Sequence, residues 1–199
     1  MTVIGITGPT GSGKTTALAA LERLGFQVVD CDALYYRVLD RDQALREGLQ
    51  REFGPVFLPD GKLDRPVLGN IVFASPTALD RLNALVYPAM SAVVGQIIEN
   101  CSGKGVVIDA INLVESGLGD LCDWTVALTA PPEVRLRRIM ARDGISEERA
   151  RARMAAQKPD RFYRRHCTFL LENRAGSRAE FDRLVEDFFK GLLCEDVEE

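Results

Sequence analysis

The stretch from Thr7 to Thr16, TGPTGSGKTT, lies near the beginning of the sequence and decides the fold. Within it, Gly8 to Thr15 fit the spacing G-x-x-x-x-G-K-[ST], whose backbone N–H groups cradle nucleotide phosphates. A short apolar run, TVIGIT, precedes the motif, and a stretch with helical spacing, KTTALAALERLG, follows it. This order of strand, loop and helix favours a phosphate-binding loop over a glycine-rich turn without a ligand.

The loop predicts a nucleotide site in which the side chains have distinct roles. Lys14 supplies a charge for the β- and γ-phosphates, and the hydroxyl of Thr15 can bind Mg²⁺. The N-terminus of the following helix adds partial positive charge. The loop residues expected to hold ATP are Gly8, Pro9, Thr10, Gly11, Ser12, Gly13, Lys14, Thr15 and Thr16.

The composition bounds the class of protein. The 199 residues include 25 basic and 29 acidic side chains, and this net charge of -4 does not favour binding to nucleic acid or to an anionic membrane. Five cysteines without a C-x-x-C pair, and a single histidine, favour reduced thiols over disulfides or a zinc site. No leader is evident and no apolar run approaches about 18 residues, so we expect a cytoplasmic protein with one domain, 1–199.

Apolar runs alternate with helical patterns and predict an α/β fold. The runs indicate five buried strands of a mainly parallel sheet flanked by helices, at 2–7, 27–30, 105–110, 124–129 and 168–171. Open sheets of this kind bind ligands beyond the carboxyl ends of their strands. The polar residues at those ends are therefore candidates for function.

Two helical segments are longer than the connections that alternating strands and helices require. The stretch 33–104 is longer than one crossover, and we interpret it as an insertion that binds the phosphate acceptor; within it, Asp60-Gly61 predicts a tight turn. Around 135–158, a helix that ends at Asp143-Gly144 and a second helix capped by Ser146 form an arginine-rich hairpin. We interpret this hairpin as a lid over the nucleotide.

Carboxylates follow the second and third expected strands. Asp30 and Asp32 stand in VVDCDA, where a carboxylate can accept the proton of an acceptor hydroxyl during phosphoryl transfer. The alternative is that Asp32 caps a helix starting at Ala33. Asp109 ends GVVIDA and suits a water-mediated Mg²⁺ contact, an acceptor contact or a simple turn.

The lid segment contains two further candidates. Arg138 and Arg142 are four residues apart and share a helix face, from which they can neutralise charge on the transferred phosphoryl group. The other arginines of the segment fit a solvated face paired with nearby glutamates: Arg135 and the arginines at 149–153, with Glu133, Glu147 and Glu148.

The loop is shared by kinases, GTPases and mechanical ATPases, so it does not fix the reaction. The sequence contains neither N-K-x-D nor D-x-x-G, which argues against an ordinary GTPase. The carboxylates after the second strand favour a kinase whose acceptor is a hydroxyl, because a phosphate acceptor would need no base.

The motifs resemble, in order and over nearly the whole chain, those of the dephospho-CoA kinase family. ITGPTGSGKTT is similar to the family's opening loop, LGFQVVDCDAL to its segment with the catalytic aspartate, and DGKLDRPVLGNIVF to D-G-x-L-D-R-x-x-L-x-x-x-V-F. VVIDAINLVESGL resembles the D-x-P-L-L-x-E segment, RLRRIMARDGISEERARARMAAQ the lid that ends in a glutamine, here Gln157, and LLENRAG the terminal N-x-G loop.

The resemblance implies a P-loop kinase fold that uses ATP and Mg²⁺ to phosphorylate the ribose 3′-hydroxyl of dephospho-CoA. It places the catalytic base at Asp32. The remaining candidates are Lys14, Arg138 and Arg142 for catalysis, Asn173 near adenine, and Asp32, Arg65, Asp109 and Glu115 on the acceptor side.

Four positions depart from the family pattern. Tyr36 stands where an arginine is usual, Tyr87 replaces the histidine before a proline, and Ile111 and Asn112 replace a proline and a leucine. These changes fall on the acceptor side more than on the loop. They leave open another small-molecule hydroxyl or a nucleoside monophosphate as acceptor, while a non-catalytic nucleotide-binding switch would need no base at Asp32.

Overall fold

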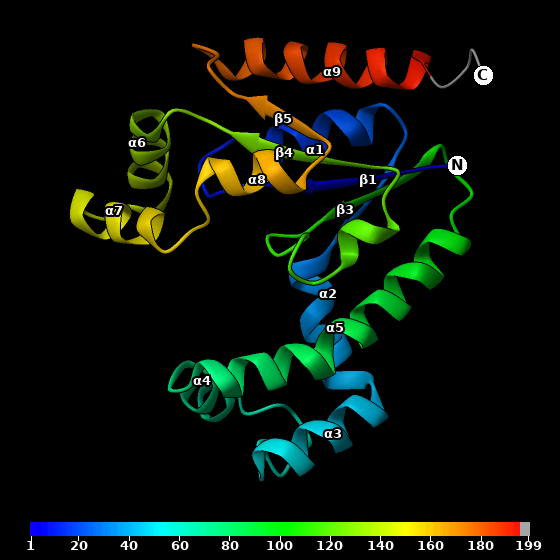
Figure 1. Cartoon of the computed structure of the whole chain (residues 1–199), viewed down its shortest axis with the longest axis vertical. Helices are drawn as coiled ribbons and strands as arrows, with labels where there is room; N and C mark the ends of the chain where they lie inside the picture. Colours follow the sequence, from blue (N-terminus) through cyan, green and yellow to red (C-terminus); the bar gives the residue numbers. More distant parts are fainter. Residues whose placement is uncertain (196–199) are drawn as a thin grey trace. The chain divides into compact units, whose positions relative to one another are not determined.

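The computed structural model describes residues 1–195 and divides into two compact units (Figure 1). The first unit combines Met1–Val29 with the chain from Cys101 onward, and the second is Asp30–Asn100. The second unit covers nearly the same residues as the expected insertion, 33–104. We describe each unit by itself.

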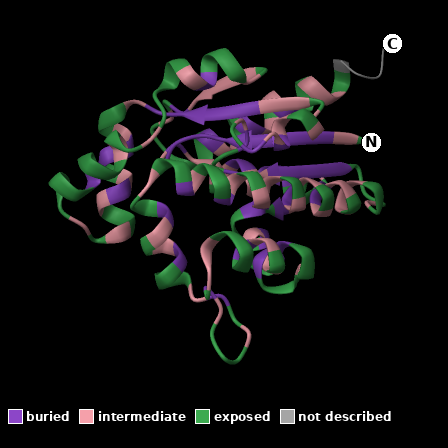
Figure 2. Cartoon of the chain, turned by 60° about the horizontal axis from the view of Figure 1, so that its bottom comes forward, coloured by how far each residue is buried: buried purple, intermediate pink, exposed green. Residues whose placement is uncertain are grey.

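A five-stranded parallel sheet organises the first unit, in the order β2-β3-β1-β4-β5. The strands are β1 (Thr2–Thr7), β2 (Gln27–Asp30), β3 (Gly105–Asp109), β4 (Trp124–Thr129) and β5 (Phe169–Glu172). In the register, Ile4 lies opposite Val107 of β3 and Trp124 of β4. The inner strands are buried, as their continuous apolar runs require (Figure 2).

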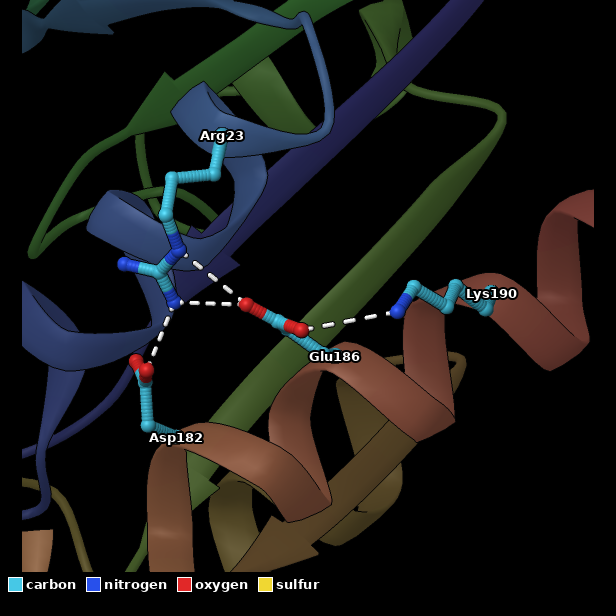
Figure 3. Close-up of polar contacts among 4 residues, drawn as sticks. All are labelled: Arg23, Asp182, Glu186 and Lys190. Carbon is cyan, nitrogen blue, oxygen red and sulfur yellow. Dashed lines mark hydrogen bonds and ion pairs between the residues drawn. The ribbon is translucent and has the colours of Figure 1, made fainter. Parts of the chain in front are cut away.

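Helices cover this sheet, and the first and last of them pack against each other. The helices of the first unit are α1 (Lys14–Arg23), α6 (Pro132–Asp143), α7 (Glu147–Ala155), α8 (Asp160–His166), α9 (Arg178–Glu195) and the 3₁₀ turn η1 (Leu118–Leu121). Helix α9 packs along α1 and contributes Phe181, Val185 and Phe189 to the sheet core. At the exposed edge of this contact, Arg23 of α1 pairs with Asp182 and Glu186 of α9 (Figure 3).

The expected lid is a helical hairpin. Helix α6 ends at Gly144, which has a φ of 62°, and Ser146 caps α7 by accepting from the Arg149 amide. A small apolar cluster around Leu136, Ile139 and Ala150 holds the two helices together. The boundaries anticipated from Gly144 and Ser146 are confirmed.

The second unit is helical. It contains α2 (Cys31–Arg41), α3 (Gln43–Phe53), α4 (Arg65–Phe73) and α5 (Pro76–Glu99), and α5 packs against the other three. Each helix begins at a side-chain cap, from Asp30, Asp42, Asp64 and Ser75 in turn. The predicted turn at Asp60-Gly61 is present between Phe57 and Leu63, which form an isolated antiparallel bridge.

Among the described residues, α5 is the one helix that could cross a membrane by length and composition alone. Its 24 residues include an 18-residue window with a mean hydropathy of 1.2. Its buried residues recur every four positions, at Ala78, Leu82, Val86, Met90 and Val94. This single stripe is typical of a helix packed on one side against its neighbours.

Candidate functional site

The glycines allow the loop to follow its tight path between β1 and α1. Gly8 has a φ of +133°, and a Cβ atom there would lie 2.1 Å from the carbonyl oxygen of Leu128. Gly13 has a φ of +111°, and its Cβ atom would lie 2.6 Å from Nδ2 of Asn173. A larger residue at either position would push the loop away from β4 or from Asn173.

The loop presents polar groups that the protein itself does not satisfy. Helix α1 starts at Lys14 without a side-chain cap, so the N–H groups of its first turn can receive an anion. Among the described residues, the buried hydroxyl of Ser12 also has no hydrogen-bond partner. A buried polar group without a partner is costly, and a bound polyphosphate is the kind of ligand that fits this loop.

Lys14 and Asp109 form an ion pair beside the loop. Lys14 Nζ lies 2.6 Å from Asp109 Oδ1, and the two side chains are only 20% and 18% exposed. Asp109 is at the carboxyl end of β3, opposite Ile6 of β1, so the sheet register brings the carboxylate to the start of α1. The structure therefore joins two residues that the sequence analysis had proposed separately.

Arg138 and Asn173 contact the loop from two separate segments of the chain. The guanidinium of Arg138 donates to the carbonyl of Gly11 at 3.2 Å and to Oδ1 of Asn173 at 3.3 Å. The amide of Asn173 in turn donates to the carbonyl of Ser12 at 3.0 Å and is buried. Both predicted residues thus contact the phosphate-binding loop.

Arg142, the other predicted lid residue, is engaged elsewhere. Its guanidinium makes two hydrogen bonds to Asp143, at 2.7 and 2.9 Å, and the Arg142 hydrogen bond is the main reason that the pKa of Asp143 lies below its usual value. Arg153 also pairs with Asp143. The solvated-face interpretation fits Arg151, which pairs with Glu147 at 2.8 Å.

Sequence reasoning assigned Arg135 to the solvated face, and the structure contradicts this. Arg135 is 7% exposed, donates from Nε to the Thr10 carbonyl at 3.1 Å, and donates from Nη2 to Oε1 of Gln157 at 2.7 Å. Gln157, seen beforehand only as the end of the lid, donates to the Thr10 hydroxyl at 2.7 Å. The available signal was spacing, because Arg135 precedes Arg138 by three residues and shares its helix face.

The carboxylates after β2 separate into two roles in the second unit. Asp30 is the N-cap of α2, and its Oδ1 accepts from the Ala33 amide at 2.9 Å. Asp32 lies in the first turn of α2 and is exposed. The alternative that Asp32 caps the helix is therefore wrong, since Asp30 supplies that cap.

The acceptor candidates Arg65 and Glu115 lie in different units. Arg65 begins α4, and its guanidinium carbon lies 3.8 Å from the ring centroid of Tyr36, one of the departures from the family pattern. Glu115 is in the first unit, where its Oε1 lies 3.6 Å from Nζ of Lys158, the last residue of the expected lid.

A metal ion at the loop would depend on the nucleotide for most of its ligands. Across residues 1–195, no group of three or more histidine, cysteine, aspartate or glutamate side chains could hold one. The Thr15 side chain is exposed at the start of α1. One hydroxyl together with phosphate oxygens and water is the usual environment of Mg²⁺ in kinases, so the residues present fit this ion.

The comparisons with known proteins agree with this geometry. The family model for dephospho-CoA kinase matches residues 2–179. The dephospho-CoA kinase of Thermus thermophilus is 36% identical over 193 residues, covering 97% of this chain and 91% of that protein. A crystal structure from Thermus thermophilus has a TM-score of 0.77 at 35% identity, covering 98% of this chain and 97% of the other. Dephospho-CoA kinase from Campylobacter jejuni has a TM-score of 0.69 at 26% identity, covering 96% of each chain. This chain therefore belongs to the dephospho-CoA kinase family of ATP-dependent phosphotransferases.

Proposed function

We propose that this chain transfers the γ-phosphoryl group of Mg²⁺-bound ATP to the ribose 3′-hydroxyl of dephospho-CoA. Membership of the family supplies the substrate class, and the arrangement of residues supports the division of roles. The five cysteines all lie within residues 1–195 and form no disulfide there, which suits our proposal of a reducing, cytoplasmic location.

The first unit carries the nucleotide chemistry. Backbone N–H groups of the loop between Gly8 and Thr16 receive the phosphates, and Lys14 exchanges its bond with Asp109 for the β- and γ-phosphate oxygens. Thr15, and Asp109 through water, would hold Mg²⁺, which supplies charge neutralisation when bound. Asn173 fixes the Ser12 carbonyl on the adenine side of the proposed site.

The lid arginines act on the charge of the transferred group. Arg138 already donates to the Gly11 carbonyl and can reach phosphate without leaving the loop's neighbourhood. Arg142 must exchange Asp143 for phosphate. Guanidinium groups suit this task because their planar donors match phosphate oxygens.

Asp32 is the proposed general base, and one observation carries this assignment. The cap of α2 is already provided by Asp30, whose carboxylate bonds to the Ala33 amide. Asp32 lies two residues after Asp30 and is exposed. The helix does not need its carboxylate as a cap. It is therefore suited to accept the proton of the attacking hydroxyl.

The acceptor itself is proposed to contact Asp32, Arg65, Asp109 and Glu115. Arg65 is positively charged and stacks on Tyr36, so its donors are free to face an anionic group while the ring fixes its direction. Within residues 1–195, no ion pair engages this guanidinium.

The test compares Asp32→Asn with Asp30→Asn. Because an amide cannot accept the proton, Asp32→Asn is expected to lower kcat by about 10²–10⁴ with little change in ATP affinity. Asp30→Asn retains a good capping side chain and is expected to keep most of the activity. ADP formation is measured with dephospho-CoA, shikimate, gluconate and nucleoside monophosphates.

The proposal fails if a nucleoside monophosphate is the best acceptor and Asp32→Asn is harmless with it. An analogue of dephospho-CoA that lacks the 3′-hydroxyl is a further control. The analogue is expected to bind. ADP formation in its presence is expected to stay at the background rate that comes from transfer to water.

A further inference from the structure

Arg135 is the most deeply buried charged residue of the part of the chain whose exposure is described. Among residues 1–194, whose exposure is described, it is the one charged residue in the buried class, at 7% exposure. Burial is also the largest influence on its pKa and lowers it, against weaker opposing effects of Asp160 and Tyr163. Arginine remains protonated in proteins, so this position holds a buried cation.

The groups that contact this cation are neutral. Its Nε donates to the Thr10 carbonyl and its Nη2 to Oε1 of Gln157. Within the part of the chain that the structure describes, no carboxylate lies within ion-pair distance of Arg135. Hydrogen bonds to oxygen dipoles satisfy its donors but leave the net charge unbalanced.

The backbone that carries this cation lies directly against the phosphate-binding loop. A Cβ atom on Gly11 would lie 3.1 Å from the carbonyl oxygen of Arg135 and 3.2 Å from its Cα atom. Gly11 has a φ of +83°, so the loop turns directly against the backbone of Arg135. The unbalanced charge is therefore placed behind the loop that receives the phosphates.

Gln157 bonds to both Arg135 and Thr10, so these three residues form a hydrogen-bonded triangle. Its Nε2 donates to the Thr10 hydroxyl at 2.7 Å while its Oε1 accepts from Arg135 at 2.7 Å. Thr10 is thus bonded through its carbonyl to α6 and through its hydroxyl to the segment that follows α7. Both ends of the lid hairpin are fixed to one residue of the loop.

We propose that Arg135, together with Gln157 and Thr10, is a positioning residue of the nucleotide site: it fixes the outer turn of the loop to the lid and supplies positive charge that bound polyphosphate neutralises. This assignment concerns ATP binding and does not depend on the identity of the acceptor. It predicts that Arg135 contributes to the affinity for phosphates and not to that for adenosine, because its contacts are with the loop.

The first experiment measures the affinities for ATP, ADP and adenosine by titration calorimetry in Arg135→Gln and in Arg137→Gln. Arg137 is an exposed arginine of the same helix and serves as the matched control. Arg135→Gln is expected to weaken ATP binding about tenfold or more, with adenosine unchanged, as for a lost hydrogen-bonded charge. Arg137→Gln is expected to remain within about twofold of the parent.

Raising the salt concentration adds an independent readout. If the charge acts on phosphate, ATP affinity in Arg135→Gln falls less steeply with salt than in the parent. Arg135→Lys keeps the charge and is expected to bind ATP more tightly than Arg135→Gln. Equal affinity of these two variants would overturn the electrostatic part of the proposal.

Thr10→Val tests the triangle where the loss of Arg135 prevents folding. It removes the hydroxyl that accepts from Gln157 and keeps the volume of the side chain. In Thr10→Val, ATP affinity is expected to fall about threefold or more, and Thr10→Ser is expected to restore it. In the double variant Thr10→Val with Gln157→Ala, the loss of affinity is expected to be smaller than the sum of the losses in the two single variants. Thr10→Val and Arg135→Gln proteins that bind ATP like the parent and differ only by a lower Tm would overturn the proposal. The triangle would then contribute to the stability of the fold and not to ATP binding.

Discussion

Lys14 illustrates how one side chain of the proposed nucleotide site also takes part in the fold. The pair with Asp109 is mostly covered, with an Nζ–Oδ1 distance of 2.6 Å. A lysine whose only task is to bind phosphate would be exposed beside the loop. Instead the sheet register supplies a carboxylate that holds Lys14 at the start of α1.

Lys14→Ala is predicted to reduce phosphoryl transfer by at least about 10², because a charge aimed at the transferred group is lost. Its Tm should fall modestly, since Asp109 then keeps a partly buried carboxylate without its cation. The double variant Lys14→Ala with Asp109→Asn should recover the Tm and not the activity. ADP formation and calorimetric melting check these outcomes, and normal turnover in a folded Lys14→Ala protein would contradict the assignment of the loop.

At the scale of elements, the arginines of helix α6 in the lid hairpin differ in their exposure and in their contacts. Arg135 and Arg138 face the loop, whereas Arg142, one turn beyond Arg138, lies with Asp143 at the exposed end of α6. A helix face predicts which arginines lie together, but it does not say which of them reaches the loop. That choice depends on how α6 packs against Gly11.

Arg138→Ala and Arg142→Ala are both predicted to lower kcat about tenfold or more, since each removes a donor to the developing phosphate charge. Arg137→Ala is the control, because its side chain is exposed and carries no proposed role. The comparison is made by steady-state kinetics with saturating ATP and dephospho-CoA. Should Arg142→Ala turn over like the parent, its pair with Asp143 is its whole function and Arg138 alone acts from the lid.

The elements that the sequence predicted well are those with local signals. The strands agree to within one residue because buried parallel strands are continuous apolar runs, as in GVVID of β3. The lid boundaries follow from Gly144 and Ser146. The helices of 30–100 were predicted only as a helical stretch, since apolar spacing there does not mark where α4 ends and α5 begins.

The contacts that the sequence missed are those between distant segments. Gln157 and Arg135 meet at Thr10, from three separate parts of the chain, and no spacing rule connects them. The cap of α2 was missed for a smaller reason, because Asp30 and Asp32 both fit the start of a helix. A shift of two residues in the helix start decided that Asp30, and not Asp32, is the N-cap.

At the scale of the whole molecule, the two compact units separate the nucleotide residues from two of the four acceptor candidates. The loop, Asp109, Glu115 and the lid belong to the first unit, and Asp32 and Arg65 belong to the second. The chain crosses between the units after Val29 and again before Cys101. Each unit has its own buried residues and capped helices, so ligand binding to each can be followed separately.

Hydrogen exchange read by mass spectrometry is predicted to distinguish the two ligands. ATP should slow exchange in the loop at 8–16 and in the lid at 132–157, because bound phosphates occupy the loop N–H groups and the lid is bonded to Thr10. The dephospho-CoA analogue without the 3′-hydroxyl should slow exchange at 31–41, 65–73 and 109–115, where the acceptor candidates lie.

The core provides the internal control for this measurement. Strand β4 and the face of α9 around Val185 are buried, so they should be protected without ligand and should not change with either ligand. Protection by the analogue that is confined to the first unit would contradict the roles of both Asp32 and Arg65, because both belong to the second. Protection at 65–73 without any at 31–41 would retain Arg65 as an acceptor contact and remove Asp32 as the base, since a general base must lie within hydrogen-bond reach of the hydroxyl that it deprotonates.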